Sequence, residues 1–203
     1  VGSEMCIRDS TGFGRTGQWF ASQTMELEPD MMALAKGLTS GYVPMSAVMV
    51  GDRVANKLVA DGGEFYHGFT YSGHPVAAAV ALANLELIER EDMITRVRED
   101  TGPYLAEALA PLAEHRIVGE IRTFGVLAAI ELVKSKDGPE MFEDTGATGV
   151  ICRDHAINRG LMMRAVRDAM ILSPALTYSR ADIDETVRIA AQALDATADQ
   201  LGL

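Results

Sequence analysis

The chain has 203 residues, 48 % of them hydrophobic and 23 % charged, as is usual for a globular protein with a buried core. Its 18 basic and 29 acidic residues give a net charge of −11, which argues against nucleic acid or an anionic membrane as the main partner. Two cysteines and four scattered histidines fit neither a disulfide framework nor a metal site, and no apolar run reaches transmembrane length. We therefore expect a cytoplasmic protein without a structural metal.

The first ten residues, VGSEMCIRDS, show neither the alternation of a strand nor the apolar stripe of a helix. They also lack the hydrophobic core of a secretory signal, and they run directly into a glycine-rich segment typical of a domain interior. We interpret residues 1–10 as a non-native junction on a chain that is missing its amino-terminal half.

An apolar run at 31–35 predicts a short buried strand that places Lys36 at its carboxyl end, before a loop with Gly37 and Gly41 at its ends. Ligands of α/β sheets bind at the carboxyl ends of strands. A partly desolvated lysine there can use its amine for carbonyl chemistry. The spacing alone favours a solvated loop lysine, because charged side chains are mostly exposed.

The elements after Lys36 fall into two groups. In the first, we expect a strand at 46–50, a helix at 52–60 with Asp52 as a possible N-cap, a polar-aromatic loop at 65–75 and a mostly buried helix at 76–89.

The second group is expected to form an α+β unit from about residue 105 onward. A helix at 92–110 should be interrupted at Gly102-Pro103. The remaining predicted elements are an antiparallel strand pair at 117–122 and 126–133, a helix at 147–159 ended by Gly160, strands at 161–164 and 169–172, and a helix at 181–198 introduced by Ser179 and Asp182.

Four motifs, TGFGRTG, PDMMALAKGL, HGFTYSGHPVAAAVALANLE and GLMMRAVRDAMILSPAL, occur in this order. Together they resemble the class III aminotransferases, which are pyridoxal 5′-phosphate (PLP) enzymes of fold type I and include the amine and ω-amino-acid:pyruvate branch. The resemblance covers nearly everything from residue 11 to the end. It implies an α/β fold: the carboxyl-terminal part of the PLP-binding large domain over 11–100, and a smaller α+β domain over 101–203.

The resemblance also implies three site residues. Lys36 matches the lysine that forms the internal aldimine with PLP and then moves a proton between the substrate α-carbon and the cofactor. Thr70 matches the threonine that reaches the phosphate of a cofactor bound mainly by the neighbouring subunit, which implies a homodimer with a shared active site. Arg164 matches the mobile arginine that grips the substrate carboxylate.

From the residues alone, simpler interpretations stay open. Thr70 could be a threonine in an aromatic turn, and Arg164 a surface arginine on an edge strand, with Arg167 as a neighbouring candidate. Arg15 is expected to hold its loop, and His67 and His74 to be structural or to support residues that contact the ligand.

The sequence departs from the family where the aspartate that pairs with the pyridine nitrogen should lie, around residues 7–10, because Asp9 is out of register there. The phosphate loop and the aromatic residue that stacks on the ring would lie further upstream.

The predicted function is therefore that of an aminotransferase fragment, which moves an amino group between an amine or amino acid and a keto acid, with pyruvate as the expected acceptor. We expect the isolated fragment to be inactive. Two alternatives remain: another class III enzyme such as an aminomutase, and a non-catalytic remnant that serves as a dimerisation module.

Overall fold

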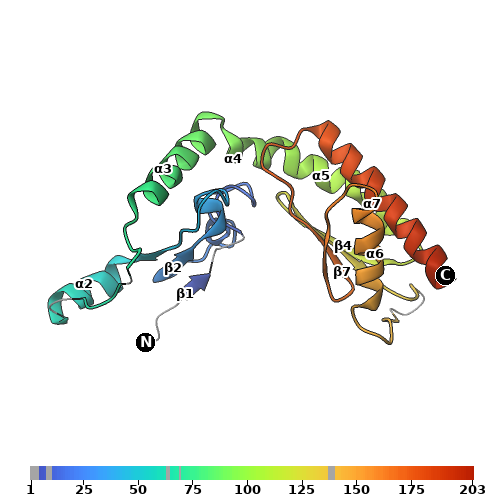
Figure 1. Ribbon diagram of the computed structural model, residues 1–203, viewed down its shortest axis with the longest axis horizontal. Coiled ribbons are helices and arrows are strands. Elements are labelled where there is room, and N and C mark those ends of the chain that lie inside the picture. The colour runs from blue at the N-terminus through green and yellow to red at the C-terminus, as the bar shows by residue number, and fades with distance from the viewer. Residues whose placement is uncertain (1–4, 8–10, 63–64, 69, 137–139) are drawn as a thin grey trace. The chain divides into compact units, whose positions relative to one another are not determined.

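The structure is a computed structural model that describes residues 5–7, 11–62, 65–68, 70–136 and 140–203. Contacts divide the chain into two compact units, Val1–Thr95 and Arg96–Leu203 (Figure 1). The predicted Asp9 departure, like most of the predicted junction, lies outside the described residues.

The first unit is built on a three-stranded sheet in the order β1-β2-β3. Strand β1 (Met5–Ile7) runs parallel to β2 (Met31–Leu34), and β2 is antiparallel to β3 (Ala47–Val50). The strands predicted at 31–35 and 46–50 are confirmed, whereas β1 lies where no strand pattern was recognised. The helical elements of this unit are α1 (Ala21–Thr24), η1 (Lys36–Leu38), α2 (Asp52–Asp61) and α3 (Pro75–Arg90).

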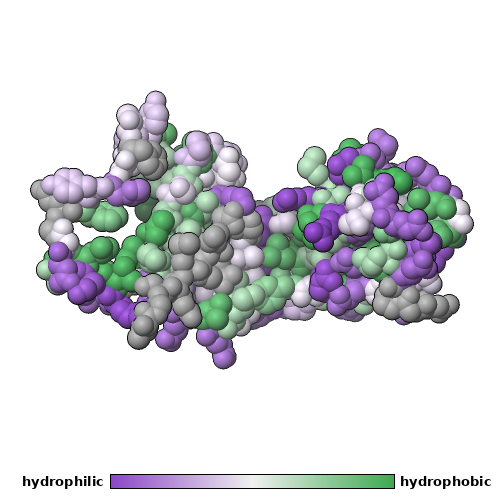
Figure 2. Space-filling view, turned by 90° about the horizontal axis from the view of Figure 1, so that it is seen from below, coloured by the Kyte–Doolittle hydropathy of each residue, from purple (hydrophilic) through white to green (hydrophobic). Residues whose placement is uncertain are grey.

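The predicted burial of the first unit is wrong in two places. Only Leu34 of β2 is buried, and α3 buries only Ala77, Ala81 and Ile88, while Leu82 is 61 % exposed. Figure 2 shows hydrophobic surface, in green, on this unit. The apolar runs were expected to be buried, but among the described residues most of their side chains are half-buried or exposed. The expected N-cap of α2 is also displaced by one residue, since Gly51 takes that position and Asp52 begins the helix.

An interrupted helix begins at the end of the first unit and continues into the second, as predicted. After α4 (Met93–Arg96), residues Val97–Thr101 form a π-helical turn, and α5 (Gly102–Leu109) and a 3₁₀ turn η3 (Ala110–Glu114) follow. A Cβ on Gly102 would lie 2.5 Å from the carbonyl oxygen of Val97 and 3.3 Å from Gly125. The wider turn therefore depends on a glycine immediately before Pro103.

An antiparallel sheet in the order β4-β5-β7-β6 forms the centre of this unit (Figure 1). Its strands are β4 (Val118–Phe124), β5 (Leu127–Leu132), β6 (Arg164–Val166) and β7 (Ala169–Leu172). Alternate residues of β5, namely Ala128, Ile130 and Leu132, are buried. The helices α5, α6 (Ala147–Ile157) and α7 (Arg180–Leu201) pack with the sheet around this core. The expected α+β arrangement is confirmed.

One predicted strand of the second unit has the wrong bounds. Pairing in β6 starts at Arg164, opposite Ile171, instead of at residue 161. Leu161 and Met163 are buried core residues that precede the ladder. The two-residue turn between Val166 and Ala169 sets the register, and the ladder ends at the pair Arg164–Ile171.

Candidate active site

Lys36 lies just beyond the carboxyl end of β2, where it begins the 3₁₀ turn Lys36–Leu38. Its backbone is left-handed, with φ +48°, a conformation that residues other than glycine seldom adopt. Its carbonyl oxygen accepts hydrogen bonds from the backbone N–H groups of Thr39 and Gly41, both at 3.3 Å. The side chain is exposed, so the described residues do not supply the partial desolvation that was expected.

The glycine-rich TGFGR segment packs behind this turn. Phe13 is buried, and a Cβ on Gly37 would lie only 2.7 Å from Cδ2 of the Phe13 ring. Phe13 also meets Phe20 edge to face, with ring centroids 5.6 Å apart. Arg15 in the same segment is half-buried, and burial lowers the pKa of its guanidinium group. The segment thus forms a close-packed support for the Lys36 turn.

Helix α3 holds the turn through Asn84. The side-chain Nδ2 of Asn84 donates hydrogen bonds to the carbonyl oxygens of Gly37, at 2.8 Å, and Leu38, at 3.2 Å. Sequence reasoning missed this contact. The available signal was an amide inside the otherwise apolar helical run, which is an unusual residue to place on a helix that packs against a core.

Thr70 is exposed in a turn that leads directly into α3. His74 is the N-cap of this helix, where its Nδ1 accepts from the backbone N–H of Ala77 at 3.4 Å, and Pro75 is the first helical residue. The structural role expected of His74 is therefore observed. A hydroxyl in the turn that precedes a helix N-terminus is chemically suited to an anion.

Arg164 belongs to the second unit, where it is the first residue of the edge strand β6 and is exposed. Arg167 lies in the tight turn between β6 and β7, with φ +54°. The next residue, Asp168, is buried and accepts hydrogen bonds from the backbone N–H groups of Gly146 and Gly149, both at 2.9 Å. Asp168 thereby satisfies the N-terminus of α6, and of the two arginines only Arg164 lies on a strand.

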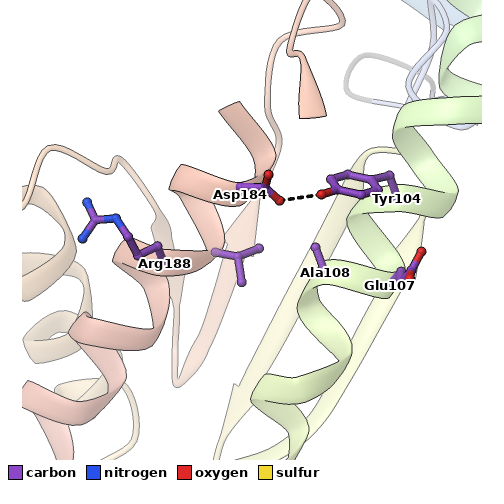
Figure 3. Close-up of a pocket in the computed structure, with 6 residues that line it drawn as sticks. Tyr104, Glu107, Ala108, Asp184 and Arg188 are labelled. Atoms are coloured by element: carbon purple, nitrogen blue, oxygen red, sulfur yellow. Dashed lines mark hydrogen bonds between the residues drawn. The ribbon is translucent and has the colours of Figure 1, made fainter. Parts of the chain in front are cut away.

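A shallow groove of about 410 Å³ lies between α5 and α7 of the second unit (Figure 3). The hydroxyl of Tyr104 donates to Oδ1 of Asp184 at 2.7 Å, and this hydrogen bond raises the pKa of the tyrosine. The guanidinium group of Arg180 lies over the same ring, 4.7 Å from its centroid. The groove contains none of the predicted site residues, and its polar contacts join the two helices.

Comparison with known proteins gives consistent matches over nearly the whole chain. The family model described as aminotransferase class-III matches residues 6–194. A putrescine–pyruvate aminotransferase of Pseudomonas aeruginosa is 52 % identical over 187 residues, which are 92 % of this chain and 41 % of that protein. A diaminobutyrate–2-oxoglutarate transaminase of Halomonas elongata is 40 % identical over 196 residues, which are 94 % of this chain and 42 % of that protein.

The fold also matches solved transaminases. The ω-transaminase of Pseudomonas jessenii in complex with PMP has a TM-score of 0.91 and 38 % identity, with 98 % of this chain and 44 % of that chain covered. The chain therefore spans about two fifths of the length of the curated relatives that it matches.

Proposed function

Because the chain belongs to the class III aminotransferases, we propose that it is the carboxyl-terminal part of an enzyme that transfers an amino group between an amine or amino acid, ω-amino acids included, and a keto acid. Its 52 % identity to a putrescine–pyruvate aminotransferase supports a diamine donor and pyruvate as the acceptor. The observation that carries the proposal is the Lys36 turn, where an exposed amine follows the end of a strand and two other segments hold the backbone.

The residues present fit PLP chemically. When bound, this cofactor supplies an aldehyde for covalent attachment and a ring that stores the electron pair released from the substrate. Lys36 provides the amine that binds the aldehyde, and once it is released the same amine moves a proton at the substrate α-carbon. The Thr70 hydroxyl donates to the phosphate of a cofactor held mainly by the partner subunit.

Arg164 is proposed to bind the substrate carboxylate. Its position on an exposed edge strand leaves the long side chain free to turn toward or away from a ligand. The planar guanidinium group pairs bidentately with a carboxylate, which suits an enzyme that binds a keto acid and a simple amine in turn.

A homodimer with a shared active site is part of the proposal, as is a cytoplasmic location. Support for further packing partners comes from β3, where Val48 is 60 % exposed and Met49 is 57 % exposed. These neighbouring side chains point to opposite faces of the strand, so apolar residues are exposed on both faces. Within the described residues, no helix is both long enough and apolar enough to span a membrane.

The isolated 203-residue chain should bind PLP poorly, because the family residues that contact the ring and most of the phosphate lie upstream of the TGFGR segment. We expect no visible absorbance of lysine-bound cofactor when PLP is added to the purified chain. A stable yellow complex that is lost in Lys36→Ala would contradict this expectation.

The function is tested in a full-length chimera, in which residues 11–203 replace the matching carboxyl-terminal part of the Pseudomonas aeruginosa relative. We expect transfer from putrescine to pyruvate, and no transfer after Lys36→Ala. In Arg164→Ala, the kcat/KM for pyruvate and for carboxylate-bearing donors should fall about tenfold or more, whereas simple amines should be little affected. Equal losses for both donor classes would refute the role of Arg164.

A further inference from the structure

We propose that Asn84 is a positioning residue for Lys36, and that its two hydrogen bonds fix the Lys36 turn to helix α3. This inference rests on the proposed function, because only an enzyme that uses the Lys36 amine requires that amine to be held in a fixed position. Asn84 itself is 46 and 47 positions away from the residues whose carbonyl groups it binds, so the contact is tertiary.

Asn84 lies on the buried side of α3. It follows the buried Ala81 by three residues and precedes the buried Ile88 by four, which places the three side chains on one face of the helix. A half-buried amide at such a position takes the place of an apolar side chain and loses contact with water. Here the two carbonyl acceptors compensate for that loss. The hydrogen bonds therefore account for a polar residue on this face.

The Lys36 turn and the residues that follow it up to Gly41 are closed by long backbone hydrogen bonds, so other contacts are needed to support them. One such contact is local, from the Thr39 hydroxyl to the carbonyl oxygen of Val43 at 2.6 Å. The backbone bonds that close the turn, from the N–H groups of residues 38–41 to carbonyl groups of residues 35–37, measure 3.2–3.4 Å. Two of its residues, Lys36 and Ser40, are left-handed without being glycine, with φ +48° and +51°. Such a conformation persists only where surrounding contacts impose it. At 2.8 Å, the bond from Asn84 to Gly37 is shorter than any of these backbone bonds.

Helix α3 then links two proposed cofactor contacts. The turn that contains Thr70 leads into its N-terminus, and Asn84 binds the Lys36 turn in its second half. A displacement of the helix would move both groups together. Lys36 would serve the cofactor of its own subunit and Thr70 the cofactor held mainly by the partner subunit. Through Asn84 and α3, these two groups of one chain, one for each of the two shared sites, would keep a fixed distance from each other.

The experiment is hydrogen–deuterium exchange of the 203-residue chain, without cofactor. Asn84→Asp keeps the shape of the side chain but replaces the donor with acceptors that face two carbonyl groups. Amides of residues 38–42 should exchange about tenfold faster than in the unaltered chain, whereas the amides of α3 and of the second unit should be unchanged. Asn84→Gln retains an N–H donor on a longer side chain. The exchange rates of residues 38–42 in Asn84→Gln should therefore lie closer to those of the unaltered chain than the rates in Asn84→Asp do.

Glu86→Gln is the matched control, a change between carboxylate and amide on the exposed face of the same helix, and it should leave residues 38–42 unaffected. The proposal is overturned if Asn84→Asp exchanges like the unaltered chain, if the whole first unit exchanges faster, or if Asn84→Gln is as fast as Asn84→Asp. Failure of the proposed function would appear elsewhere, as a chimera without cofactor on Lys36, because the exchange experiment contains no cofactor.

Discussion

The residues around Lys36 show what the sequence could and could not predict at the smallest scale. The four motifs together predicted a catalytic role for Lys36, which stays a prediction, and the turn after β2 was expected. The left-handed backbone of Lys36 and the contact of Gly37 with Phe13 could not be predicted, because both depend on segments more than twenty residues apart meeting in space. The same holds for Asn84, whose helical position was recognised without its partner.

Gly37→Ala should destabilise the first unit by about 1–3 kcal/mol, because the added Cβ would lie 2.7 Å from the buried ring of Phe13. The free energy of unfolding, measured in urea, would report this loss. Gly68→Ala is the control, since its nearest described contact would be Oγ of Ser72 at 3.9 Å. Equal stability of the two variants would show that the Lys36 turn has room behind it.

Cys152 should make the second unit less stable at high pH. It is fully buried, and this burial raises the pKa of its thiol to about 11. Between pH 9 and 11 the unfolded chain loses the thiol proton while the folded chain keeps it. The free energy of unfolding should therefore be unaffected by this group below pH 9 and fall by about 2–3 kcal/mol up to pH 11.

Urea unfolding of the unaltered chain and of Cys152→Ala at several pH values isolates this effect, because the other titrating groups are common to both proteins. The two curves of stability against pH should converge above pH 9. Parallel curves would show that the thiol ionises alike in the folded and unfolded chains.

At the scale of elements, local signals predicted most helices and strands. Ser179 and Asp182 form the capping box of α7, as expected. Helix α6 ends earlier than expected, at Ile157 with Asn158 as its C-cap, and Gly160, with φ +89°, lies two residues further on. The interruption at Gly102-Pro103 was also predicted, although its π-helical form was not, because that form depends on packing against Gly125. Burial was predicted less well, since an apolar run does not reveal how many of its sides are covered.

Asp168 links two elements, because it follows the β6–β7 turn and binds the N-terminus of α6. Asp168→Ala should lower the free energy of unfolding by about 2–3 kcal/mol, since two backbone N–H groups would lose their acceptor. Asp168→Asn keeps one acceptor oxygen and should lose about half as much. Asp144→Ala, an exposed change near the same helix start, should be nearly neutral, and a similar loss there would argue against the cap.

At the scale of the whole molecule, the chain forms two compact units and spans about two fifths of the length of its class III relatives. The resemblance predicted the α/β fold class, and the structure matches solved transaminases over nearly its full length. Exposed apolar residues on both faces of β3 could not be predicted from the sequence, because alternation and apolar runs are interpreted on the assumption of a complete sheet.

The most direct test of the account is borohydride reduction of the PLP-loaded chimera, followed by peptide mapping. This chain contributes four lysines, Lys36, Lys57, Lys134 and Lys136, so the modified residue can be assigned without ambiguity. We predict one reduced pyridoxyl adduct, on Lys36, and none in Lys36→Ala. An adduct on another lysine, or no adduct at all, would contradict the account.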